Sequence, residues 1–206
     1  MDFSATSIWT MTKLFVRDPG AAARLVFAAD IPLNVSILMI VLSAVMSSFF
    51  SGIQMQFVES PRGIVALADG NNVEIIMGGP LEQAILAVIM GLSFGYAVFR
   101  IGKPFGGVGS FATILSAIAV LQIISVVFEG EVFAAFFILP FTTLFIWMFG
   151  LFVMIRGLVF SVDIGHELGA VAKAAFVVFL AGLSAVVAVG FIAGLTGIGF
   201  DLELVV

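Results

Sequence analysis

The stretch that decides the fold runs from Arg100 to Phe128 and reads RIGKPFGGVGS followed by FATILSAIAVLQIISVVF. Its first part is a short connector with two positive charges, Arg100 and Lys103, and four glycines. Its second part, residues 111–128, is eighteen residues long and carries no charge. A membrane-spanning helix needs about 20 mainly apolar residues. The pattern therefore predicts a basic loop at one membrane surface that leads into a transmembrane helix.

The composition of the whole chain agrees with a membrane protein. Apolar residues make up 62% of the 206 positions and charged residues only 10%, whereas soluble domains carry about 25% charged residues. So few charges could not cover the surface of a soluble core, but a bilayer requires no such cover. The length is therefore better read as a number of membrane crossings than as a number of soluble domains.

Four further apolar stretches surround the first one. The predicted spans are about residues 33–50, 81–99, 111–128, 132–153 and 174–193. Glu129, Gly130 and Glu131 are predicted to form a very short turn, which makes spans three and four an antiparallel hairpin. The expected fold is an all-α polytopic transmembrane helical bundle of five spans, with residues 31–206 as the membrane domain and residues 1–30 as N-terminal interfacial helices.

The N-terminal region is predicted to hold two short helices that lie along the membrane. Residues 4–16 place apolar side chains near helical spacing, and Trp9 is typical of headgroup depth. Asp18 and Pro19 then supply an N-cap and a first helical residue for a second helix. Between spans one and two, residues 52–80 contain the turn sequence Asp-Gly-Asn-Asn at 69–72, so a small hairpin or a docked loop is expected there.

The basic residues predict the orientation. With a cytoplasmic N-terminus, seven of the eight lysines and arginines fall on the inner side, and Arg62 alone falls outside. This is a clear positive-inside bias, and five spans then place the C-terminus outside. Six of the seven inner residues are candidate lipid-headgroup or topology charges: Arg17, Arg24, Arg100, Lys103, Arg156 and Lys173.

Small residues in the spans mark candidate packing faces. Gly91 and Gly95 form a G-x-x-x-G pair in span two, and Ala181 and Ala185 belong to a fifth span rich in small residues, which suits it to pack against several neighbours. Pro140 falls near the middle of the predicted fourth span. Because proline removes a backbone hydrogen bond, a kink is expected there.

Each polar residue inside the spans can be interpreted either as a structural hydrogen-bonding group or as part of a path for a substrate. Gln122 is a candidate intramembrane polar contact, and we favour a structural interhelical hydrogen bond over a contact with a substrate. Ser43, Ser47 and Ser51 recur every four residues in span one. Hydrogen bonds within that helix or to a neighbour are favoured over a polar path through the membrane.

The chain offers little that points to catalysis. It contains no cysteine and a single histidine, so His166-Glu167 cannot belong to a two-histidine zinc motif. The glycines after Lys103 follow a membrane loop rather than a strand, which argues against a dinucleotide fingerprint. We expect no catalytic residues, no metal, no cofactor and no enzymatic activity. The absence of a basic run argues against nucleic acid as a partner.

Two segments carry a resemblance to a known family. LFVRDPGAAARLVF precedes span one, and Gly106 to Phe111 reads Gly-Gly-Val-Gly-Ser-Phe before span three. There are five spans, and the third and fourth are joined by a tight turn. In these features the chain resembles the Ypt-interacting protein (Yip) family in its short bacterial form, over about residues 13–193. Eukaryotic members are multispanning proteins of the secretory pathway that associate with prenylated Rab GTPases and with each other. The resemblance implies no catalytic residues, and the lack of a long N-terminal region argues against a GTPase partner.

Two functions from different classes follow as hypotheses. The first is a non-enzymatic, Yip-like membrane protein of the bacterial cytoplasmic (inner) membrane that organises lipids or membrane partners, alone or as a homo- or hetero-oligomer. The second is a small oligomeric transporter or channel, suggested by Pro140, Gln122 and the serines of span one.

Overall fold

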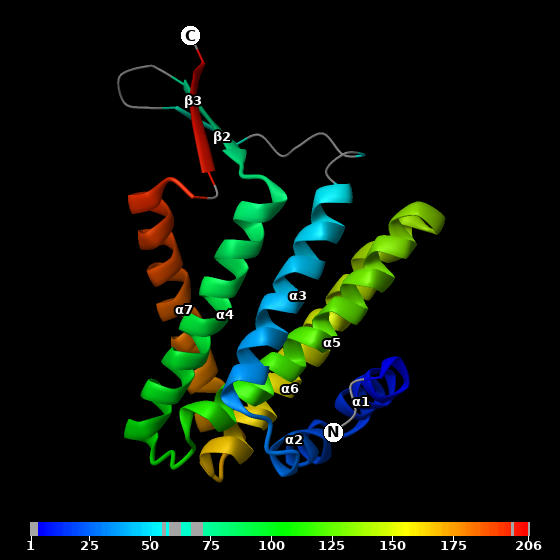
Figure 1. The fold of residues 1–206 in the computed structure, drawn as a ribbon, viewed down its shortest axis with the longest axis vertical. Helices are drawn as coiled ribbons and strands as arrows, with labels where there is room; N and C mark the ends of the chain where they lie inside the picture. Colours follow the sequence, from blue (N-terminus) through cyan, green and yellow to red (C-terminus); the bar gives the residue numbers. More distant parts are fainter. Residues whose placement is uncertain (1–3, 55–56, 58–62, 67–71, 199, 206) are drawn as a thin grey trace.

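The computed structural model describes residues 4–54, 57, 63–66, 72–198 and 200–205. Arg62 and most of the 69–72 turn, which the sequence analysis discussed, lie outside this description. Five helices in the described part are long and apolar enough to cross a membrane. Their bounds are α3 Leu33–Gln54, α4 Pro80–Gly102, α5 Phe111–Ile138, α6 Thr143–His166 and α7 Val171–Thr196. The predicted all-α class with five spans is confirmed (Figure 1).

Helix α5 is the centre of the bundle. It packs against α3, α4 and α6, and 56% of its most apolar window is buried, against 17–33% for the other four spans. Every residue from Ile114 to Leu121 is buried. Ser110 caps the start of this helix, and its hydroxyl accepts a hydrogen bond from the Thr113 backbone N–H at 3.1 Å. This side-chain cap fixes the exit of the glycine loop into the central span.

Two short helices precede the spans, as the sequence predicts. They are α1 (Ala5–Arg17) and α2 (Pro19–Ala28). The Asp18 carboxylate accepts a 2.8 Å hydrogen bond from the Ala21 N–H, so it caps α2 as expected. Both helices lie against α5 and α6 (Figure 1), and Phe15 of α1 is almost fully buried there.

The turn between the third and fourth spans differs from the prediction. Helix α5 continues through Glu129 and Glu131 and ends at Ile138. Leu139 leaves the helical conformation, with φ −141° and ψ 73°, because the residue before a proline is pushed away from it. Pro140 then starts the short 3₁₀ helix η2 (Pro140–Thr142) that leads into α6. The kink predicted at Pro140 is therefore wrong: this proline lies in the connection and not inside a span.

The fifth span packs against more than one neighbour, as its small residues led us to expect. Helix α7 packs mainly against α4 and α6, at one edge of the bundle (Figure 1). Ala181 and Ala185 are buried as expected, but Phe179, Val187 and Phe191 are largely exposed. The small residues therefore serve close packing on one face of α7, and its large apolar side chains lie on the exposed face.

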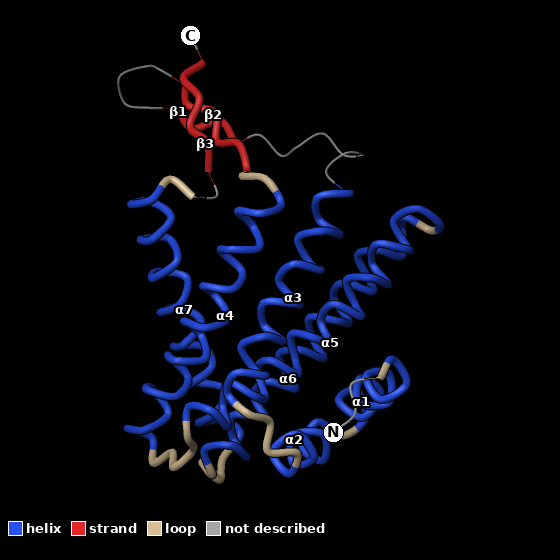
Figure 2. The backbone as a smooth tube through the Cα atoms, viewed as in Figure 1, coloured by secondary structure: helices blue, strands red, loops and turns tan. Residues whose placement is uncertain are grey.

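A small antiparallel sheet lies at one end of the bundle, beyond the helix ends (Figure 2). Its strands are β1 (Gly63–Ala66), β2 (Asn72–Met77) and β3 (Phe200–Val205). Strands β1 and β2 form the small hairpin considered from the sequence. Strand β3 was not expected, and it pairs along β2 from Asn72 to Met77.

The two termini lie at opposite ends of the bundle. The C-terminus and the sheet are at one end, whereas α1, α2 and the α4–α5 and α6–α7 connections are at the other (Figure 1). An odd number of crossings requires this arrangement. The basic residues of the predicted inner side belong to the end that holds α1 and α2.

Candidate functional site

The side chains of Gln122, Ser43 and Gly91 meet where α3, α4 and α5 come together. The Ser43 hydroxyl lies 3.3 Å from the Gln122 Oε1 and 2.9 Å from its own helix at the Ile40 carbonyl. A Cβ atom on Gly91 would lie 2.6 Å from the Gln122 Nε2 and 3.1 Å from the Ile40 Cγ2, so glycine lets α4 approach both neighbouring helices closely. Gln122 therefore makes the interhelical contact that we favoured from the sequence.

Gly95, the second glycine of the pair, faces the same central helix. A Cβ atom there would lie 2.7 Å from the Leu115 Cδ1. The G-x-x-x-G pair of α4 thus packs on α5, and this predicted packing face is confirmed.

The serines of α3 fall into two groups. Ser43 bonds to Gln122 of α5, and Ser51 donates a 3.1 Å hydrogen bond to the Gln83 Oε1 of α4. Ser47 lies between them along the helix and makes no hydrogen bond to the other described residues. It faces a cleft of about 470 Å³ between α3, α5 and α6.

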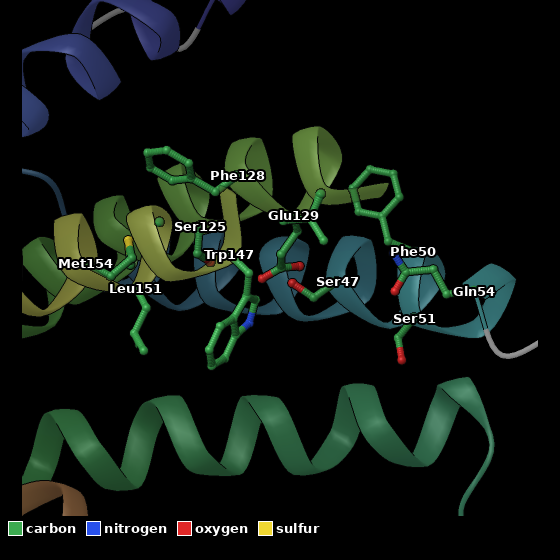
Figure 3. Close-up of a pocket in the computed structure, with 12 residues that line it drawn as sticks. Ser47, Phe50, Ser51, Gln54, Ser125, Phe128, Glu129, Trp147, Leu151 and Met154 are labelled. Carbon is green, nitrogen blue, oxygen red and sulfur yellow. The ribbon is translucent and has the colours of Figure 1, made fainter. Parts of the chain in front are cut away.

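This cleft is the main candidate site, and we call it the Glu129 cleft (Figure 3). The Glu129 carboxylate and the Ser47 hydroxyl point toward each other inside it, and the Trp147 ring lies beside them. The other lining side chains are largely apolar or aromatic, with Ser51, Gln54 and Ser125 adding polar groups. Trp147 is 55% exposed and Leu151 45% exposed, so the cleft opens on the flank of the bundle.

The second glutamate of α5 lies in different surroundings. Glu131 lines a smaller cleft of about 160 Å³ between α1 and the α5–α6 hairpin. Lys13 and Arg17 of α1 line the same cleft. The two glutamates are two residues apart on one helix, and they therefore project in different directions.

The glycine loop between α4 and α5, residues 102–109, wraps around the single histidine. His166 ends α6 and is fully buried, with its Nε2 3.2 Å from the Val98 carbonyl. Cβ atoms on Gly102 and Gly107 would each lie 2.5 Å from a ring nitrogen. A Cβ atom on Gly109 would meet the Gly165 carbonyl. Gly102, Gly107 and Gly109 are thus required by the close approach of α6, whereas Gly106 has a positive φ of 92° that favours glycine. Both are structural roles.

The basic residues divide into bonded and exposed ones. Lys103 donates a 3.1 Å hydrogen bond to the Gly109 carbonyl and lies 5.1 Å from the centre of the Phe99 ring, so it also stabilises the glycine loop. The Arg156 guanidinium lies 3.5 Å from the Val16 carbonyl of α1. The remaining candidates are exposed at the same end of the bundle: Arg17, Arg24, Arg100 and Lys173.

Sequence reasoning missed the Glu129 cleft because it placed Glu129 in a surface turn. The available signal was Pro140, because proline is disfavoured inside a helix and common where a helix begins, which places the turn near residues 139–142. The role of His166 was also missed. Its glycine partners are about 60 positions away in the chain, and no local pattern connects them.

These features define an integral membrane protein with a five-span helical bundle, a lateral cleft and a glycine loop closed on a buried histidine. Comparisons of the chain with protein-family models, with curated proteins and with solved structures give no match.

Proposed function

We propose that the protein is a non-enzymatic membrane scaffold of the Yip-like class, which organises lipids or other membrane proteins. In this proposal it belongs to a bacterial cytoplasmic membrane, with α1 and α2 on the cytoplasmic side. Its partners are lipids, copies of itself or other membrane proteins, and a GTPase is not required.

The observation that carries the proposal is the closed packing at the centre of the bundle. Where α3, α4 and α5 meet, Gly91 and Gly95 bring the helices into contact, and the Gln122 amide is used between helices. The buried hydroxyls of Ser36, Ser43 and Ser116 donate to carbonyls of their own helices. Polar groups satisfied in this way stabilise packing and provide no sites for a moving solute.

The proposal also agrees with the distribution of exposed surface. The flanks of α3, α6 and α7 present large apolar side chains, which suit lipid or a neighbouring helix. The positively charged end presents Arg24, Arg100 and Lys173 to a surface at which anionic lipids would be attracted.

A transporter remains the second candidate, and one observation favours it. Glu129 is an ionisable residue inside a spanning helix, and such residues often line the pathway of a solute or proton. This position was not expected when the two glutamates were assigned to a turn.

Purified protein in liposomes separates the two candidates. As a scaffold it should give no more proton, ion or solute flux than empty liposomes, and crosslinking in native membranes should capture neighbouring proteins or copies of the chain. Flux that requires the protein and disappears in Glu129→Gln would contradict the scaffold and support the transporter.

A further inference from the structure

We propose that the Glu129 cleft binds the headgroup of a lipid that carries a primary ammonium group, with the Glu129 carboxylate as its counter-ion. This inference deepens the proposed function, because it names the class of lipid that the scaffold would hold. It rests on the proposed function in one respect: the cleft is taken to bind a ligand and not to transport a solute.

The first argument is the position of the carboxylate. Glu129 lies nine residues before the end of α5, which is about 14 Å along a helix axis. From residue 132 the chain runs outward to Ile138 and returns in α6 as far as Ile155 without a charge. An ionised carboxylate at such a depth is costly unless a cation or hydrogen-bond donors face it. Among the residues that the structure describes, none that lines the cleft is basic.

The second argument is the neighbouring hydroxyl. Of the three serines on this side of α3, Ser43 and Ser51 bond to glutamines of α5 and α4. Ser47 bonds to no other described residue, and its hydroxyl points toward the Glu129 carboxylate (Figure 3). The carboxylate accepts hydrogen bonds, and the hydroxyl can accept them as well as donate one. A primary ammonium has three N–H donors and can bind both at once.

The third argument is the wall of the cleft. The Trp147 ring lies beside the two polar groups, and an aromatic face attracts a cation. Leu151 and Met154 continue the wall with apolar surface that suits an acyl chain. The cleft opens on the flank of the bundle, where Trp147 and Leu151 are exposed. Its volume of about 470 Å³ is in the usual range for small-molecule sites, about 300–1,000 Å³.

The same chemistry predicts which lipids are disfavoured. A trimethylammonium headgroup keeps the positive charge but has no N–H group to donate to Glu129 and Ser47. A glycerol headgroup has no positive charge, and its phosphate would be repelled by the carboxylate. The expected order of affinity is phosphatidylethanolamine, then phosphatidylcholine, then phosphatidylglycerol.

The test is native mass spectrometry of the full-length protein released from bilayers that contain the three lipids in equal amounts. The wild type should retain phosphatidylethanolamine in preference to the other two. Glu129→Gln should reduce that retention by about tenfold to a hundredfold, since a hydrogen bond to a charged group contributes about 1.5–3 kcal/mol. Ser47→Ala should reduce the retention of phosphatidylethanolamine by a smaller factor. This second variant keeps the test possible if Glu129→Gln does not fold.

Glu131→Gln is the matched control, because it removes the same charge from the same helix but faces the α1 cleft. It should retain phosphatidylethanolamine as the wild type does. Equal retention by Glu129→Gln and the wild type, an equal loss in Glu131→Gln, or a preference for phosphatidylglycerol would overturn the inference. The inference would also be overturned if a protein were bound in place of lipid and Glu129→Gln released that protein. The flux measurement tests the scaffold proposal, and the lipid measurement tests the binding proposal. The failure of one proposal can therefore be distinguished from the failure of the other.

Discussion

At the scale of single residues, the contact between Gly107 and His166 gives the sharpest prediction. Alanine at 107 would place its Cβ 2.5 Å from the imidazole Nδ1, which is buried and has no room to move away. Overpacking of this kind costs about 1–3 kcal/mol. We therefore expect Gly107→Ala to lower the thermal unfolding midpoint of the protein in detergent.

The double variant tests the cause of that loss. Gly107→Ala with His166→Ala should be less destabilised than the sum of the two single variants, because His166→Ala removes the imidazole part of the clash. The double variant should still be less stable than His166→Ala, since a Cβ atom at 107 also lies 2.8 Å from the Gly102 carbonyl oxygen. Gly190→Ala is the control: a Cβ atom there meets nothing within 4 Å, and alanine is the better helix former by about 1 kcal/mol. Additive losses in the double variant would show that the imidazole is not what excludes a larger residue at 107.

Residues differ in how far the sequence reveals their roles. Gln122 could be assigned because an amide within an apolar span must find a partner, and Gly91 and Gly95 could be assigned because their spacing makes a flat face. His166 could not, since its contacts are glycines of a distant loop. Glu129 was misplaced because acidic residues beside a glycine resemble a surface turn, and the backbone at Pro140 shows where α5 ends.

At the scale of elements, the end of α5 can be tested with proline. If the turn were at 129–131, residue 132 would begin the next helix, and proline is tolerated at the first helical position. In the structure Val132 lies inside α5, where proline costs about 3 kcal/mol or more. We expect Val132→Pro to destabilise the protein strongly, as measured by thermal unfolding and by the yield of monodisperse protein.

Pro140→Ala is the companion variant. Because Pro140 lies in the connection between α5 and α6, its replacement should change stability by at most about 1 kcal/mol, mainly through the entropy of the unfolded chain. If Pro140→Ala lowered stability strongly and Val132→Pro lowered it only weakly, the results would favour the turn at 129–131 and the kink at Pro140 that the sequence suggested.

At the scale of the whole molecule, the number of spans and the two N-terminal helices follow from long apolar runs and their capping residues. The central position of α5 does not, since α7 is at least as apolar and is the least buried span. The sheet shows the limit of this reasoning. Strand β3 pairs with β2 across more than 120 positions of sequence, from Asn72↔Val205 to Met77↔Phe200. Helices are encoded by neighbouring residues, whereas this pairing depends on how the bundle brings its loop and its tail to one end.

The side of the membrane on which each end lies stays a prediction from the basic residues, and the chain is well suited to testing it because it contains no cysteine. Val108 is exposed in the glycine loop, and Gly79 is exposed before α4, at opposite ends of α4. In intact cells an impermeant maleimide should label Gly79→Cys and leave Val108→Cys unlabelled until the membrane is opened. The reason is that Arg100 and Lys103 hold the glycine loop on the cytoplasmic side. Labelling of Val108→Cys in intact cells, with Gly79→Cys protected, would invert the orientation and place α1, α2 and their cations outside.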